Sequence, residues 1–249
     1  MRPVTTAELL NTWEQCARRT LPEKALLLLD TACADGEPED PALLNIGDRD
    51  AKLLQLREWM FGQQLLNITD CPNCGERIEW INNIADLRYP SENKSTSSAT
   101  FNVEVENYNI QFRLPNSYDL LKASSRDYQS DPKKLLAECI IDVHRNEQTC
   151  QAGELPAQVM DVLDERMSLE NPQANIMMNL SCPSCSHSWE AQFDIASYLW
   201  IEIDSWAKHI LQEVAVLAAA FGWSESQILN LSPQKRQYYI DIINGQFHQ

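Results

Sequence analysis

The chain has 249 residues, of which 44% are apolar, so it can bury a sizeable core in one or two domains. Its 36 acidic residues outnumber its 20 basic residues, which gives a formal net charge of −16. A nucleic-acid-binding protein normally displays a basic stripe that displaces counterions from phosphates. This composition therefore argues against a nucleic-acid partner and suits a partner with a basic protein surface.

The N-terminal part, residues 1–62, is expected to be helical. Thr5 or Thr6 can cap a first helix, and Pro22 opens a second. Gly47 and Asp48 precede a third helix, which ends at Gly62. Composition further predicts two polar loops, at residues 36–41 and 91–100.

Two segments then share the pattern Cys-Pro-X-Cys, at residues 71–74 and 182–185. Two intervening residues, one of them a Pro with a fixed φ, form a tight turn that directs both sulfurs to one ion. One such turn supplies two ligands, and a closed structural zinc site needs four. The sequence therefore predicts one tetrahedral zinc site formed by Cys71, Cys74, Cys182 and Cys185.

Apolar residues flank both turns in the alternating pattern of β-strands. They include Ile68 and Trp80 around the first turn, and Leu180 and Trp189 around the second. We therefore expect two β-hairpins, at residues 63–87 and 174–195, which face each other across the ion as a zinc ribbon.

The two hairpins read as an internal repeat with one departure. When they are aligned on their second cysteine, Asn83 coincides with Asp194, and each is a plausible helix N-cap. Gly75 follows the first turn, where a positive φ is often required, whereas Ser186 follows the second.

Two other interpretations of the cysteines are ordinary buried thiols and a redox motif. A thioredoxin-like motif opens a helix within a βαβ unit, but both motifs here lie between strands. His187 is a spare candidate ligand that a four-cysteine site does not need. Four sulfurs leave no position for water or substrate, so the zinc is expected to be structural.

Between the hairpins, residues 100–170 predict an extra β-hairpin and several helices. Strands on either side of a tight turn at Glu106–Asn107 alternate in hydrophobicity. Asn116 or Ser117 caps a helix, Pro132 opens another that extends through Val143, and an acidic helix follows. The carboxylates of this last helix are typical of a solvated face, and they are Asp161, Asp164, Glu165 and Glu170.

Residues 194–249 are expected to be C-terminal helices, of which the first is the longest and ends at Gly222. Tyr238 and Tyr239 are adjacent, so a helix cannot bury both on one narrow stripe. One of them is expected to face outward near Trp223 and Phe247, as a candidate partner surface.

These elements predict a mostly helical α+β fold, with a helical body, an inserted zinc ribbon of two β-hairpins and an extra β-hairpin. Because 182 − 74 = 108, 107 residues separate the two ligand pairs. The ribbon must therefore be built into a larger body, and we expect one composite unit from residue 1 to 249.

The sequence shows no pattern that predicts catalysis. It contains no Gly-rich phosphate loop, nucleophile elbow or HExxH motif.

The sequence also lacks the roughly 18 consecutive apolar residues that span a bilayer and the apolar segment of a signal peptide. Four further cysteines are scattered, at Cys16, Cys33, Cys139 and Cys150, and free thiols beside a zinc site indicate a reducing compartment. We therefore expect a cytoplasmic protein that is not an enzyme, with no small-molecule substrate and no membrane.

Four stretches together resemble one known family: RPVTTAELLNTWEQ, CPNCGERIEW, SCPSCSHSWEAQFDIASYLWIEIDSWA and FGWSESQILNLSPQKRQYYIDII. It is the T4-like phage baseplate hub assembly family, in the form found in bacterial clusters for phage-tail-like contractile injection systems. The resemblance implies a role at, or in building, the baseplate hub, with hub, spike or tube proteins as partners. It implies no catalytic residues.

Two other functions are weighed against this one. A zinc-ribbon adaptor in transcription or nucleic-acid handling is disfavoured by the acidic charge. An enzyme with an unrecognised site is disfavoured by the closed sulfur shell and the missing motifs.

Overall fold

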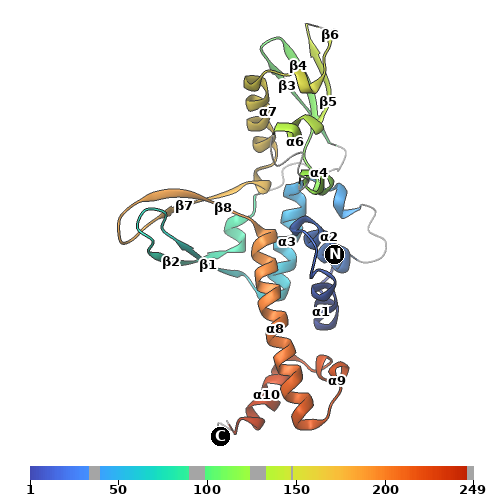
Figure 1. Ribbon diagram of the computed structural model, residues 1–249, viewed down its shortest axis with the longest axis vertical. Coiled ribbons are helices and arrows are strands. Elements are labelled where there is room, and N and C mark those ends of the chain that lie inside the picture. The colour runs from blue at the N-terminus through green and yellow to red at the C-terminus, as the bar shows by residue number, and fades with distance from the viewer. Residues whose placement is uncertain (34–39, 90–98, 124–132, 147, 246–249) are drawn as a thin grey trace. The chain divides into compact units, whose positions relative to one another are not determined.

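The computed structural model describes residues 1–33, 40–89, 99–123, 133–146 and 148–245. Helices predominate in it, and its strands form three small antiparallel sheets (Figure 1). The predicted mostly helical α+β class is therefore confirmed. Predicted features at residues 36–39 and 91–98, Pro132 and Phe247 lie outside the described residues.

The chain forms two compact units. The first contains Met1–Ala34 and Ser197–Gln249, and the second contains Asp35–Ala196. The expectation of one composite unit stays a prediction.

Helices form the regular structure described in the first unit. They are α1 (Thr6–Gln15), α2 (Leu21–Ala32), most of α8 (Ile195–Phe221), α9 (Glu225–Leu229) and α10 (Pro233–Ile243). The Thr5 hydroxyl accepts a hydrogen bond from the Glu8 N–H, and the Glu8 carboxylate accepts one from the Thr5 N–H. This reciprocal cap makes Thr5, rather than Thr6, the residue that starts α1.

The core of the first unit packs α8 against its neighbours through a cluster formed by Leu10, Ala207, Ile210, Val214, Leu217 and Ile228. Polar contacts add to it. The Trp13 indole donates to the Asp204 carboxylate at 3.0 Å, and the Lys24 ammonium lies 4.4 Å from the ring centre of Trp200. These contacts bind the N-terminal helices to α8.

The first α-helix described in the second unit is α3 (Ile46–Phe61), which follows the short 3₁₀ helix η1 (Pro41–Leu43). Asn45 caps this helix by accepting a hydrogen bond from the Asp48 N–H at 3.0 Å, and Gly62 ends it with a φ of 88°. The predicted end is therefore confirmed. The helix starts before Gly47, earlier than predicted, because the Asn45 side chain supplies the cap.

Two β-hairpins lie side by side in the second unit (Figure 1). They are formed by β1 (Gln64–Asp70) with β2 (Arg77–Asn83), and by β7 (Ile176–Ser181) with β8 (Ser188–Phe193). Asn83 occupies the N-cap of the short helix η2 (Ile84–Leu87). The Asp194 carboxylate accepts from the Ala196 N–H at 3.0 Å at the start of α8. Both predicted caps are confirmed.

Residues 100–170 contain a four-stranded sheet in the order β3-β4-β5-β6. Its strands are β3 (Thr100–Val105), β4 (Tyr108–Arg113), β5 (Ile140–Arg145) and β6 (Gln148–Thr149), and its helices are α4 (Ser117–Ala123), α6 (Lys133–Glu138) and α7 (Ala157–Glu170). A core of Tyr108, Ile110, Phe112, Cys139, Val143, Val159, Met160, Leu163 and Met167 joins α7 to the sheet. The predicted β3–β4 hairpin is confirmed.

The prediction of a helix that extends through Val143 is wrong beyond Glu138. Residues Ile140–Arg145 form β5 instead, which pairs with β4. Ile140, Ile141 and Val143 are β-branched and lose side-chain freedom in a helix. Pairing with β4 also buries Val143 in the core described above.

Candidate metal centre

The two Cys-Pro-X-Cys turns have the same backbone geometry. The N–H of Cys71 donates to the Glu76 carbonyl and that of Cys182 to the His187 carbonyl, both at 2.8 Å. The residue four positions after each first cysteine donates back to its carbonyl, at 2.9 Å in both turns. Each residue of the second hairpin has a number 111 higher than its equivalent in the first, because 182 − 71 = 185 − 74 = 111. This shift aligns both cysteines and every residue pair between the strands. The hairpins are therefore a structural repeat.

The sequence departure at Ser186 does not change this geometry. Gly75 has a φ of 74°, and Ser186 has a φ of 59° at the equivalent position. A left-handed conformation costs a residue with a Cβ about 1–2 kcal/mol. The second turn therefore holds strain that the first turn avoids.

The turns bring the four cysteine sulfurs within 4.8 Å of one another. The Sγ atoms of Cys71 and Cys185 are 3.7 Å apart, and those of Cys74 and Cys182 are 3.6 Å apart. Four sulfurs placed tetrahedrally at about 2.3 Å from one ion are about 3.8 Å apart, whereas a disulfide requires about 2.05 Å. The spacing fits shared ligation of an ion, and each close pair joins one hairpin to the other.

The four thiols differ in environment. Cys71 and Cys182 are buried, Cys185 is half-buried and Cys74 is exposed. The pKa of Cys185 is lowered to about 6, because its sulfur accepts hydrogen bonds from the Asn73 amide and the His187 backbone N–H.

Cys74 shows the opposite behaviour. The Glu76 backbone N–H lowers its pKa, but hydrogen bonding with Cys185, desolvation and the other two thiols outweigh this and raise the pKa to about 12. The Cys185 thiol thus ionises readily, whereas the Cys74 thiol retains its proton. Four thiolates at this spacing repel one another, so full ionisation requires a cation among them.

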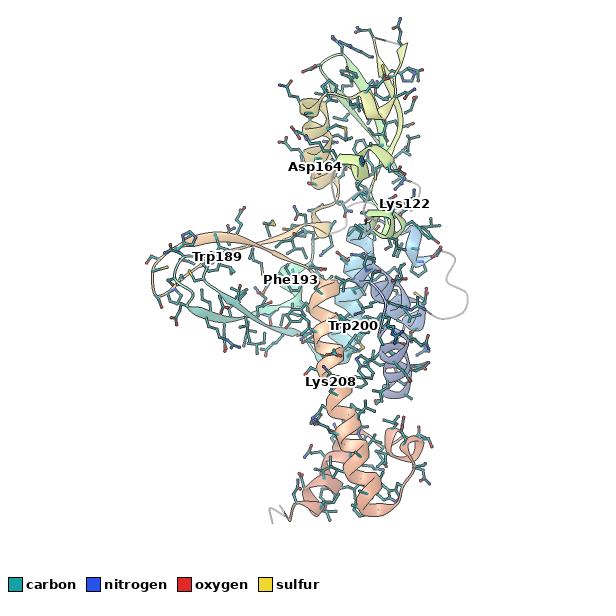
Figure 2. All side chains as sticks on the ribbon, viewed as in Figure 1. Lys122, Asp164, Trp189, Phe193, Trp200 and Lys208 are labelled. Carbon is teal, nitrogen blue, oxygen red and sulfur yellow. The ribbon has the colours of Figure 1, made fainter. Side chains whose placement is uncertain are left out.

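No other described side chains form such a group. Among the described histidines, cysteines and carboxylates, these four cysteines are the only set of three or more close enough to share an ion. His187 instead stacks on Trp189, with ring centres 5.9 Å apart; Figure 2 shows Trp189 on its hairpin. Burial raises the pKa of Cys139 to about 12 and also raises that of Cys16. Such thiols are poor nucleophiles.

One of the two adjacent tyrosines faces outward as predicted, and its role as a partner surface stays a prediction. Tyr238 is 59% exposed, so one of the two adjacent tyrosines does face outward. Tyr239 packs edge-on against Trp223 and Phe221, with ring centres 4.9 and 5.6 Å away. Sequence reasoning missed the stacking of Phe221 on Trp223, which depends on the turn that Gly222 makes with a φ of 70°.

Acidic side chains of α7 take part in ion pairs. On α7, Asp161 pairs with Lys133 at 2.7 Å and Glu170 pairs with Arg166, as on a solvated helix face. In the described part of the chain, every helix is too short or too polar to cross a membrane.

Comparison with known proteins identifies a family. The model of a family described as T4 bacteriophage base plate protein matches residues 2–200. The match includes both Cys-Pro-X-Cys turns and ends within α8. Neither the curated proteins nor the solved structures contain a match.

Proposed function

The chain belongs to the T4 bacteriophage base plate protein family, and we propose that it is a structural component or assembly factor of a baseplate hub. The hub is that of a contractile phage tail or a phage-tail-like injection system, and the role is non-enzymatic. The family match over residues 2–200 is the observation that carries this proposal. The partners proposed are hub, spike or tube proteins, with no nucleic acid, membrane or small-molecule substrate.

We further propose that the four clustered cysteines, Cys71, Cys74, Cys182 and Cys185, hold a structural zinc ion. Zinc suits four thiolates in a tetrahedron, and the sulfur separations of 3.6 and 3.7 Å fit that arrangement. Four protein ligands leave no open position on the ion, which supports a scaffolding role.

The zinc would tie together two hairpins that are distant in the sequence. Its ligand pairs bracket 107 residues, including the four-stranded sheet and α7. The unfolded chain does not hold the four sulfurs together, so the free energy of zinc binding contributes directly to folding.

Elemental analysis of protein made without a metal-binding tag tests the zinc site. We expect one zinc per chain, and we expect Cys74→Ser and Cys182→Ser each to lower both zinc content and melting temperature. Cys150→Ser is the matched control, because the Cys150 thiol lies outside the sulfur group and donates to the Gln148 carbonyl. A well-folded preparation without zinc would refute the assignment.

Affinity purification from the native cells tests the hub role. We expect hub, spike or tube proteins to be recovered, whereas polymerase or ribosomal proteins would favour the adaptor function instead. Tyr238→Ala should reduce recovery of the tail partner without changing zinc content or melting. Tyr89→Ala removes a tyrosine of comparable exposure (45%) in the second unit and should leave recovery unchanged. Equal recovery with both variants would exclude Tyr238 from the interface.

A further inference from the structure

One face of the β1–β2 hairpin carries three adjacent apolar side chains that are exposed. Leu66 pairs with Ile81 across the two strands, and Ile68 lies two residues further along β1. Because side chains alternate along a strand, all three lie on the same face, whereas Leu65 on the opposite face is buried. Leu66 is 55% exposed, Ile68 47% and Ile81 59%. These three side chains form a contiguous apolar surface, which we call the β1–β2 patch.

The other hairpin shows that this fold does not require the patch. The β7–β8 hairpin repeats the strand pairing and the turn hydrogen bonds of β1–β2. Asn179 and Gln192 nevertheless stand at the positions equivalent to Ile68 and Ile81, and Met177 is the one apolar residue among the three equivalents. A hairpin of this geometry therefore accepts polar side chains there. Contiguous exposed apolar side chains that the fold does not need indicate a surface for another molecule.

The size of the patch favours a short segment over a second copy of the chain. A stable interface buries about 800 Å² on each partner, which about 20–30 residues supply. Three partly exposed side chains provide only a small share of that area. A dimer would also bring together two chains that each carry a net charge of −16, and their repulsion opposes it.

The charges beside the patch specify what should flank such a segment. The hairpin carries the carboxylates of Asp70, Glu76 and Glu79 and the guanidinium of Arg77, for a net charge of 1 − 3 = −2. Glu79 pairs with Ile68 across the strands, and Asp70 follows Ile68 by two residues, so both carboxylates adjoin the patch on its own face. Arg77 lies 3.4 Å from Glu79 and offsets one of the negative charges. The remaining excess attracts a basic segment.

We propose that the β1–β2 patch binds an extended segment of another protein, in which alternating apolar residues are flanked by lysine or arginine. Alternation places the apolar side chains of an extended segment on one face, with the spacing that separates Leu66 from Ile68. The basic flanks meet the carboxylates beside the patch. The proposal adds a second interaction surface to that of Tyr238 and does not depend on the baseplate role.

Heteronuclear NMR of the whole chain tests the proposal with the synthetic peptide KKVTVTLKK as the probe. We expect this peptide, at up to about 5 mM, to shift the backbone resonances of Leu66, Ile68 and Ile81. The variant Ile68→Asn/Ile81→Gln installs the residues of the β7–β8 hairpin and should weaken binding about tenfold, because it removes most of the exposed apolar surface. The peptide EEVTVTLEE should bind about fivefold more weakly than KKVTVTLKK, since its flanks are repelled.

The matched control is Ile141→Asn/Leu169→Gln, which removes two apolar side chains that are 50% and 73% exposed and lie outside the hairpin. It should bind as the unmodified protein does, and both double variants should melt normally because the replaced side chains are exposed. Absence of shifts in the hairpin with KKVTVTLKK, equal shifts with KKSTSTSKK, or equal weakening by both variants would overturn the proposal. A dimer in sedimentation that Ile68→Asn/Ile81→Gln dissociates would also overturn it and would assign the patch to a second copy.

Discussion

Removing the buried guanidinium of Arg236 should destabilise the first unit strongly. Arg236 is 2% exposed, and its Nε donates to the Glu213 carboxylate at 2.7 Å while a terminal nitrogen donates to the Leu231 carbonyl at 2.8 Å. Arg236→Met keeps most of the side-chain volume but leaves Glu213, which is 9% exposed, without its buried partner. Such a loss costs about 3–5 kcal/mol.

We expect the lower end of this range, about 3 kcal/mol, because Glu213 keeps a second partner when Arg236 is lost. The exposed His209 imidazole lies 3.2 Å from the other Glu213 oxygen. For a chain of this length that corresponds to roughly 6–12 °C in melting temperature. Urea unfolding followed by tryptophan fluorescence measures it, since Trp206 and Trp223 pack on the same core.

Two further variants make the reasoning refutable. Lys208→Met removes the exposed partner of Asp204 on the same helix, and it should cost less than about 1 kcal/mol. Glu213→Leu combined with Arg236→Met removes both buried charges and should recover most of the lost stability. If Arg236→Met is no worse than Lys208→Met, the ion pair does not contribute as argued.

Three more predictions concern the second unit. Burial raises the pKa of Asp50 to about 6 from 3.8 despite the attraction of Arg49, so the folded protein binds this proton more tightly than the unfolded chain. The free energy of unfolding of the unmodified protein therefore falls as pH rises through this window. Denaturation at several pH values should show the stability of Asp50→Asn, relative to the unmodified protein, rising by about 2 kcal/mol between pH 4 and 6; a constant difference would contradict this. Ser186→Gly should stabilise the zinc-loaded protein by about 1 kcal/mol and Gly75→Ser should destabilise it by a similar amount in guanidinium unfolding, and shifts of the same sign would show that the left-handed turns are not strained. Gly47→Ala would place a Cβ 1.8 Å from Asn171 Oδ1 and should cost about 2 kcal/mol in thermal melting, whereas Gly153→Ala, with open space around it, should change little.

The cluster of four cysteines was predictable because its signals are local. A Cys-Pro-X-Cys pattern specifies a turn within four residues, and the alternating flanks of each turn specify the strands that carry it. Each turn supplies two ligands, and a closed structural zinc site needs four, so the two turns could be assigned to one site from the sequence. Capping residues such as Thr5 and Asp194 were predictable for the same reason, since their partners lie two or three residues away.

Features that depend on pairing between distant strands were not predictable in this way. The segment from Ile140 to Arg145 becomes a strand because β4 is available beside it, and sequence periodicity does not reveal that partner. Similarly, Glu104, Asn109 and His144 lie side by side on three neighbouring strands because of how β3 pairs with β4 and how β4 pairs with β5. The turns and the core together set these pairings. Tertiary context decides both cases.

Comparison of the two hairpins indicates what constrains each part of them. The β1–β2 hairpin exposes Leu66, Ile68 and Ile81. The equivalent positions of the β7–β8 hairpin carry Met177, Asn179 and Gln192. The outer faces therefore differ in chemistry at two of these three positions. The turns nevertheless share hydrogen bonds and cysteine positions, and Ser186 has a positive φ where glycine would be relaxed. Folding of an isolated hairpin requires no such agreement between two distant turns. A shared ion does, because all four sulfurs must meet at one point, and the retained strain of Ser186 is consistent with that requirement.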